Sequence, residues 1–250
     1  LDRVTPKPHP RIPLPQHILG EGRIAARGLD LTDPAVLAPL AAEMTASATA
    51  DWQAAPVIGG ITVLTGLLWW TVAIHLLASM TMVWLAVLLY VKIGQPDAGS
   101  YVACVPAPLR RLTALSAVAL AAVLVTGTMV TGAGPHAGDK SLDRPVPRLQ
   151  IEITTLVHMH SSLLVAYLSL VIGLGFGLLA VRAPRDVRTR LAVLVVLVAA
   201  QGLLGTIQFF TGVPAALVAL HVAGAAACTA ATAALWASMR ERTEAEPLQR

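Results

Sequence analysis

Charged side chains are absent from four long stretches of this chain. The uncharged stretches cover residues 57–91, 112–138, 153–181 and 191–239, and they contain 35, 27, 29 and 49 residues. An apolar helix needs about 20 residues to cross the hydrocarbon core of a bilayer. Each stretch can therefore hold one membrane-spanning helix, and the longest can hold two. The pattern predicts an all-α, polytopic membrane protein.

Turn residues divide these stretches into individual helices. A Thr65-Gly66 turn interrupts the first stretch, and Gly212 and Pro214 interrupt the last one, because glycine ends helices and proline starts them. The sequence thus predicts a bundle with one partial span and five full spans. The partial span is Val57–Leu67, and the full spans are Trp69–Val91, Leu112–Thr131, Glu152–Val181, Arg190–Phe210 and Pro214–Met239.

Residues 1–56 differ from the rest of the chain. They contain eight of the seventeen prolines and no apolar window of membrane length. We interpret them as an atypical, mostly extramembrane and poorly ordered segment, with a short helix near Pro34–Thr49.

Composition narrows the class of protein further. Only 13% of the residues are charged, 56% are hydrophobic and the mean hydropathy is +0.70, whereas soluble domains carry about 25% charged residues. Soluble, disordered and nucleic-acid-binding classes are excluded. The net charge of +4 comes from basic loops. Loops 92–111 and 182–190 are the basic ones and should be cytoplasmic, which places the C-terminus in the cytoplasm and loop 132–151 outside.

An internal repeat at an offset of 146 residues links two parts of the chain. Both copies read as a helix end, a Thr-Gly turn and a histidine nine residues beyond the glycine. The matching positions are Gly59, Ile61, Thr65, Gly66 and His75 in one copy and Gly205, Ile207, Thr211, Gly212 and His221 in the other. Duplicated halves are a common way to build membrane bundles.

Four histidines lie within predicted spans, near the outer ends of their helices: His75, His158, His160 and His221. Ionisable side chains in hydrocarbon are candidates for function. Imidazoles at one depth in a bundle can provide the axial nitrogens of a haem, although hydrogen bonding to neighbouring helices is the alternative. His158 and His160 are about 200° apart around a helix, so both cannot face one cofactor, and periodicity does not decide between them. His136 lies in the external loop, where a solvated residue is expected, although such a loop could cover a site.

Several of these segments resemble bacterial haem A synthase. The resemblance spans about residues 57–239 and rests on Val57–Leu67, the Val125–Asp139 segment with its Thr-Gly-Ala-Gly-Pro-His-Ala-Gly-Asp loop, Leu156–Leu164, Gln201–Gly205 and the helix that carries His221. That family oxidises a methyl group of haem O to the formyl group of haem A, in a bacterial plasma membrane, with two four-helix bundles.

The resemblance also implies roles for three histidines. His160 and His221 would bind the iron of a haem b cofactor, since His160, and not His158, is followed directly by Ser161-Ser162 and two leucines. His75 would bind the iron of the substrate, haem O. Residues 57–111 would be the remnant of the substrate-haem bundle and residues 112–250 the haem b bundle. Haem O synthase or an electron donor or acceptor would be the partners, besides the lipid bilayer, and no nucleic acid is expected.

The chain departs from that family at its N-terminal side. The family's Glu-x-x-His helix would fall near residues 6–34, where the many prolines exclude a membrane span, and the family's paired outer-loop cysteines are missing. We therefore expect that two and a half helices are absent and that no catalytic residue can be named. The predicted function is haem A synthase, an oxidoreductase, in truncated form. The alternatives are a non-catalytic b-type haem-binding or electron-transfer membrane protein, and a transporter fragment with structural histidines.

Overall fold

The computed structural model describes residues 54–96, 99–142 and 145–243. The chain divides at Gly59 into two units, and the second unit begins at Gly60. All elements below belong to the second unit, apart from the first half of α2. The helix predicted near Pro34–Thr49 lies outside the described residues.

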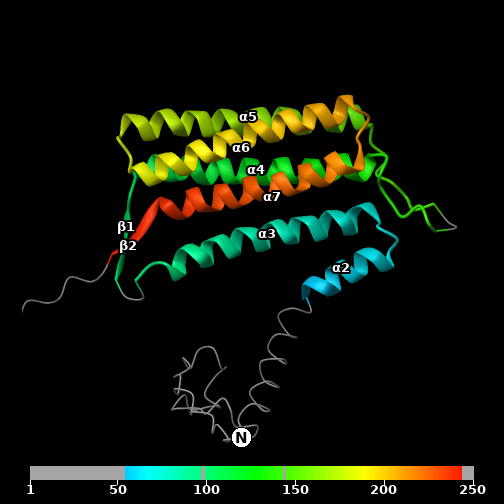
Figure 1. Ribbon diagram of the computed structural model, residues 1–250, viewed down its shortest axis with the longest axis horizontal. Helices are drawn as coiled ribbons and strands as arrows, with labels where there is room; N and C mark the ends of the chain where they lie inside the picture. The colour runs from blue at the N-terminus through cyan, green and yellow to red at the C-terminus, as the bar shows by residue number, and fades with distance from the viewer. Residues whose placement is uncertain (1–53, 97–98, 143–144, 244–250) are drawn as a thin grey trace, which may run out of the picture. The chain divides into compact units, whose positions relative to one another are not determined.

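Helices make up most of the described chain (Figure 1). The short helix α2 is followed by five long ones, which are each long and apolar enough to cross a membrane. The all-α, polytopic architecture with five full spans and a partial one is therefore confirmed. The helices are α2 (Ala54–Leu64), α3 (Trp69–Ile93), α4 (Ala107–Ala133), α5 (Ile153–Ala180), α6 (Arg185–Phe210) and α7 (Ala215–Ser238).

Two helices begin five residues before the predicted spans. Helix α4 starts directly after Pro106 and α6 directly after Pro184. Proline has a backbone φ that suits a helix start, so these residues fix where the helices begin. The arginines of the first turns extend beyond the apolar part. The uncharged stretches therefore mark the segment that a membrane would enclose, which is shorter than the helix.

Helices α4 to α7 form a ring. Helix α4 packs against α5, α5 against α6, α6 against α7, and α7 returns to α4, while α3 lies against α4 and α7. Figure 1 shows α4 to α7 running alongside one another. The interior of the ring is apolar, with side chains such as Tyr167, Leu174, Leu194 and Leu235 fully buried. Helices α5 and α7 face each other across this interior.

The repeat found in the sequence is confirmed in the turns α2–α3 and α6–α7. In each turn, three consecutive amides donate hydrogen bonds to carbonyls that lie four, three and five residues earlier in the chain. The donating amides are those of Thr65, Gly66 and Leu67 in one turn and those of Thr211, Gly212 and Val213 in the other. Both glycines have a positive φ, +68° and +79°. This left-handed conformation favours glycine, which explains why the Thr-Gly pair recurs.

A small antiparallel sheet is the one element type that the sequence did not predict. Strand β1 (Ser100–Ala103) pairs with β2 (Arg240–Thr243), with Ser100 opposite Thr243. The Arg242 guanidinium lies 5.1 Å from the centre of the Tyr101 ring. The sheet joins the α3–α4 connection to the segment after α7. Within the described residues, the all-α description therefore needs this one addition.

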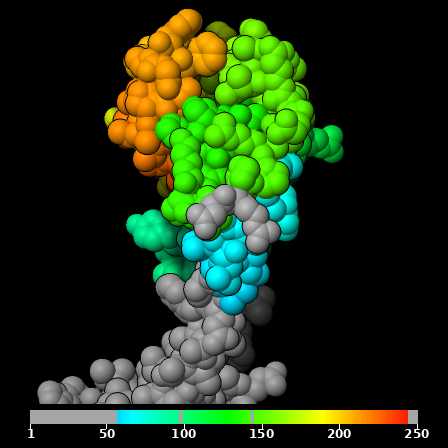
Figure 2. Space-filling model, turned by 90° about the vertical axis from the view of Figure 1, so that its right-hand side faces the viewer, coloured from blue at the N-terminus to red at the C-terminus, as the bar shows by residue number. Residues whose placement is uncertain are grey.

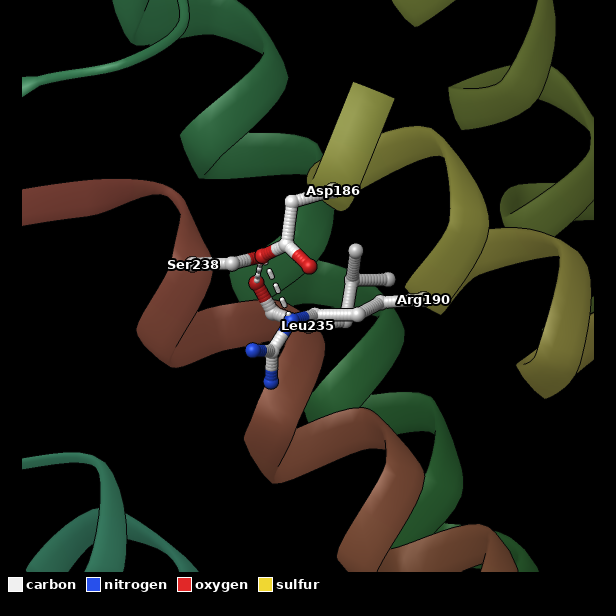
Figure 3. Close-up of polar contacts among 4 residues, drawn as sticks. All are labelled: Asp186, Arg190, Leu235 and Ser238. Atoms are coloured by element: carbon white, nitrogen blue, oxygen red, sulfur yellow. Dashed lines mark hydrogen bonds and ion pairs between the residues drawn. The ribbon is translucent and has the colours of Figure 1, made fainter. Parts of the chain in front are cut away.

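Charged residues also lie at the end of the bundle where the sheet is. Arg190 and Asp186 form an ion pair of 2.8 Å across the first turns of α6, close to the end of α7, where the Ser238 hydroxyl donates to the Leu235 carbonyl (Figure 3). Because the ion pair is solvent-exposed, it adds little to stability. The arginine-rich α5–α6 turn and the C-terminal end of α7 lie at the same end of the bundle because α6 and α7 pack as a hairpin (Figure 1).

At the opposite end of the bundle, the segment between α4 and α5 contacts both the α2–α3 turn and the α6–α7 turn. The Asp139 amide donates to the Gly66 carbonyl at 2.9 Å, and the His136 Nε2 lies 2.7 Å from the Val213 carbonyl. Figure 2 views this end, where the green segment lies between the orange α6–α7 turn and the cyan α2–α3 turn. His136 is solvent-exposed, as expected for a loop residue, but its imidazole also ties this segment to the α6–α7 turn.

Candidate functional site

Two of the predicted site residues meet inside the ring of helices. His160 comes from α5 and His221 from α7, and the centres of their imidazole rings are 6.5 Å apart, with the ring planes at 62°. Both side chains line one pocket. Helices α5 and α7 are diagonal in the ring, so the two imidazoles approach each other across the interior of the bundle.

The pocket around these histidines is mostly apolar. It has about 680 Å³ of empty space, part of which is open to the outside, and its walls include Leu120, Leu164 and Val198. Small-molecule and cofactor sites are typically lined by apolar side chains and have a few convergent polar groups. The lining of the pocket therefore has the character that suits an apolar cofactor.

The His160 ring is held by α4. Its Nδ1 lies 3.0 Å from the Val123 carbonyl oxygen and 3.2 Å from the Thr126 Oγ1. A carbonyl oxygen only accepts hydrogen bonds, so we assign the proton of the neutral imidazole to Nδ1. The lone pair of Nε2 is then free to bind a metal. Metal-binding histidines usually donate their other N–H in this way.

The His221 ring is held less completely. Its Nδ1 is buried and has no hydrogen-bond partner, whereas the Gln201 Nε2 donates to the main-chain carbonyl of His221. Burying a polar nitrogen without a partner costs free energy, and such groups are rare in folded proteins. The Nδ1 of His221 is thus the polar atom of this pocket that the protein itself leaves without a partner.

Each histidine ring lies against a glycine of the preceding helix. A Cβ atom added to Gly127 on α4 would be 3.1 Å from the His160 Cε1, and one added to Gly205 on α6 would be 3.0 Å from the His221 Cε1. The hairpins α4–α5 and α6–α7 thus present their imidazoles in the same way. Sequence reasoning missed the role of these glycines, although each of them begins a Gly-Thr pair.

The geometry fits an iron ion between two imidazoles. With a metal–nitrogen bond of about 2.0 Å and about 1.1 Å from the nitrogen to the ring centre, two imidazoles that hold one metal ion from opposite sides would have their centres about 6.2 Å apart. The observed distance is 6.5 Å. In the described part of the chain, no group of three or more His, Cys, Asp or Glu side chains gathers.

The other histidines lie elsewhere. His158 is solvent-exposed, so only His160 of this pair points into the pocket. His75 is half-buried on α3 and is not among the residues that line the pocket, although its neighbour Leu76 is. The structure thus separates His158 from His160, which the helical periodicity could not do. It does not bring His75 together with the other two.

Glu152, the acidic residue that begins the predicted Glu152–Val181 span, has a local role. It precedes α5 directly, and its carboxylate accepts hydrogen bonds from the hydroxyls of Thr154 and Thr155. These bonds, and the nearby His158 to a smaller extent, lower the pKa of Glu152 below its usual value. An ionised carboxylate at a helix N-terminus is stabilised by the helix dipole. A catalytic residue can therefore not be assigned to this position.

Comparison with known proteins gives only short matches. A stretch of 51 residues is 49% identical to the Bifunctional protein PutA of Salmonella typhimurium, and a stretch of the same length is 45% identical to the Bifunctional protein PutA of Klebsiella aerogenes. Each match covers 20% of this chain and 4% of the relative. The protein of the same name from Escherichia coli is 44% identical over 54 residues, 22% of this chain and 4% of its own length. No family model and no solved structure matches.

These findings correct the family assigned from the sequence. The matched proteins carry another name than haem A synthase, so the resemblance to that family is contradicted. The structure gives a physical reason for the error. Gly66 and Gly212 have a positive φ, and Gly127 and Gly205 lie against histidine rings, so local geometry alone favours glycine at these positions of the resemblance. A match of 51 to 54 residues also cannot include both His160 and His221, which are 61 positions apart. The matches therefore say nothing of the site as a whole.

Proposed function

We propose that this chain is an integral membrane protein that binds haem b between His160 and His221 and transfers electrons. The single observation that carries the proposal is the 6.5 Å separation of the two imidazole centres inside an apolar pocket. The Nδ1–H of His160, which donates to a backbone carbonyl, and the two glycines beside the rings support it.

The residues of the site define what chemistry they would allow. His160 and His221 would hold the haem iron through their Nε2 atoms, and the surrounding leucines and valines would exclude water. When bound, haem b supplies a one-electron Fe(III)/Fe(II) couple. If both imidazoles hold the iron, the site would favour electron transfer over binding of oxygen.

Charge segregation supports an orientation in the membrane. The arginine-rich α5–α6 turn lies at the same end as the C-terminal end of α7 (Figure 3). By the positive-inside rule this end faces the cytoplasm. We propose a bacterial plasma membrane location with a cytoplasmic C-terminus, in which the electron donor or acceptor docks at either face.

The proposal is tested by adding haemin to the purified protein in detergent and recording its absorption spectrum. We expect the spectrum of a low-spin, bis-imidazole haem b, which His160→Ala and His221→Ala each abolish. His158→Ala is the matched control, because His158 is exposed and only two residues from His160. Unchanged haem binding in His160→Ala or His221→Ala would disprove the proposed ligands, and its loss in His158→Ala would do the same.

Oxidation of haem O stays a prediction from the sequence. His75, the expected ligand of the substrate haem, does not line the pocket described here. General acid–base catalysis typically contributes about 10²–10⁴ in rate, and among the residues that the structure describes no carboxylate lines the pocket. We therefore expect no detectable haem A when this chain is expressed alone with haem O, and pigment extraction with chromatography tests this.

A further inference from the structure

The two imidazoles of the site differ in their hydrogen bonds. The Nδ1 of His160 has two neighbours, the Val123 carbonyl and the Thr126 hydroxyl, while the Nδ1 of His221 has none. The position on α6 that corresponds to Thr126, directly before the glycine at the ring, is Leu204. A leucine cannot accept a hydrogen bond. This pair of residues therefore accounts for the side-chain acceptor that His160 has and His221 lacks, while the backbone carbonyl contact of His160 is a separate difference.

The Thr126 hydroxyl is oriented to accept from the imidazole. The Thr126 hydroxyl donates its proton within α4, because Oγ1 lies 3.0 Å from the carbonyl oxygens of both Ala122 and Val123. The lone pairs of Oγ1 are then available to the Nδ1–H of His160. The side chain is 6% exposed, so water does not compete well for this contact.

We propose that Thr126 is a positioning residue that makes His160 the stronger electron donor of the two haem ligands and thereby lowers the reduction potential of the haem. This inference rests on the proposed function. An acceptor at Nδ1–H increases the basicity of the coordinating nitrogen. A more basic nitrogen stabilises ferric over ferrous iron, so the midpoint potential falls. His221, with an unpaired Nδ1, is the weaker donor.

Thr128 offers a matched control on the same helix. Like Thr126, it is 6% exposed and its hydroxyl donates to a backbone carbonyl of the preceding turn, that of Val125. No contact joins Thr128 to His160 among the described side chains. Thr126→Val and Thr128→Val remove the same atoms from equally buried positions, so a comparison of the two separates the contact with His160 from general effects on α4.

The experiment is a redox titration of the haem-loaded protein with dithionite, in which each ferric haem gains one electron. Loss of such outer contacts typically costs 10- to 100-fold in metal affinity. We expect Thr126→Val to lower the affinity of the site for ferric haem relative to ferrous haem about tenfold. This change corresponds to a rise of about 59 mV in midpoint potential. Thr126→Ser, which keeps the hydroxyl, and Thr128→Val should titrate as the wild type.

A Thr126→Val protein with haem bound and an unchanged midpoint would overturn the inference while leaving the proposed function intact. A rise of the same size in Thr128→Val would overturn it as well. If the wild type itself binds no haem, the proposed function fails and this inference with it. Should Thr126→Val not fold, as judged by circular dichroism and gel filtration, Thr126→Ala removes the hydroxyl without the additional methyl group and decides the question.

Discussion

Replacing Gly205 with alanine should weaken haem binding measurably, because the new methyl group would press on the His221 ring. The added Cβ would lie 3.0 Å from the Cε1 of His221, about 0.4 Å inside the 3.4 Å at which ordinary contact begins. The ring must move away or tilt, and the lone pair of its Nε2 then no longer points along the axis to the opposite imidazole. Crowding of this kind in a packed interior typically costs about 1–3 kcal/mol.

That cost corresponds to a roughly 5- to 150-fold increase in the dissociation constant for haem. Gly127→Ala should have a similar effect through His160, where the added Cβ would lie 3.1 Å from Cε1. The assay is a titration of the haem-free protein with haemin, followed in the Soret band. Gly173→Ala is the control, because it lies in α5 with no atom within 4 Å of the added Cβ. Equal affinities of Gly205→Ala, Gly173→Ala and wild type would refute this reasoning.

Three further predictions concern other parts of the chain. His75→Ala should leave the haem b spectrum unchanged, since His75 does not line the pocket, and absorption spectroscopy checks this. The pKa of Glu152 is lower in the folded protein than its usual 4.5, so this carboxylate stabilises the fold above that pH, and the contribution is lost as the pH falls through the folded-state pKa. The apparent Tm of Glu152→Gln should therefore decrease less than that of the wild type as the pH falls. Thermal scans from pH 3 to pH 7, roughly the range in which carboxylates titrate, measure this difference. Gly212→Ala should cost about 1–2 kcal/mol, because φ is +79° and nothing crowds the site, whereas Gly60→Ala in α2 should not destabilise; comparative thermal melts decide this.

Much of the fold could be predicted from the sequence, because a bilayer imposes simple rules. Uncharged stretches of sufficient length can only be membrane helices, and the glycine of a tight turn must accept a positive φ, as Gly66 and Gly212 do. The sheet could not be predicted in this way. Strands β1 and β2 are four residues each and about 140 residues apart in the chain, so their pairing depends on where the helix ends lie in the folded bundle.

The site could be predicted only in part. The depth of the histidines within the spans indicated a shared cofactor, but helical spacing left His158 and His160 equivalent. Only the packing of α5 in the ring turns His160 inward and His158 outward. The hydrogen bonds of Thr126 depend on the rotation of α4 about its own axis, which residue types do not reveal. The family assignment was wrong because residues required by local geometry were interpreted as marks of common descent.

The most direct measurement is electron paramagnetic resonance of the purified ferric protein, loaded with one equivalent of haem b. The spin state of the iron reports whether two strong axial nitrogens are bound. We expect a low-spin signal in the wild type and in His158→Ala, and loss of that signal in both His160→Ala and His221→Ala. A high-spin wild type, or a low-spin signal that survives in either of the last two variants, would contradict a haem held between His160 and His221.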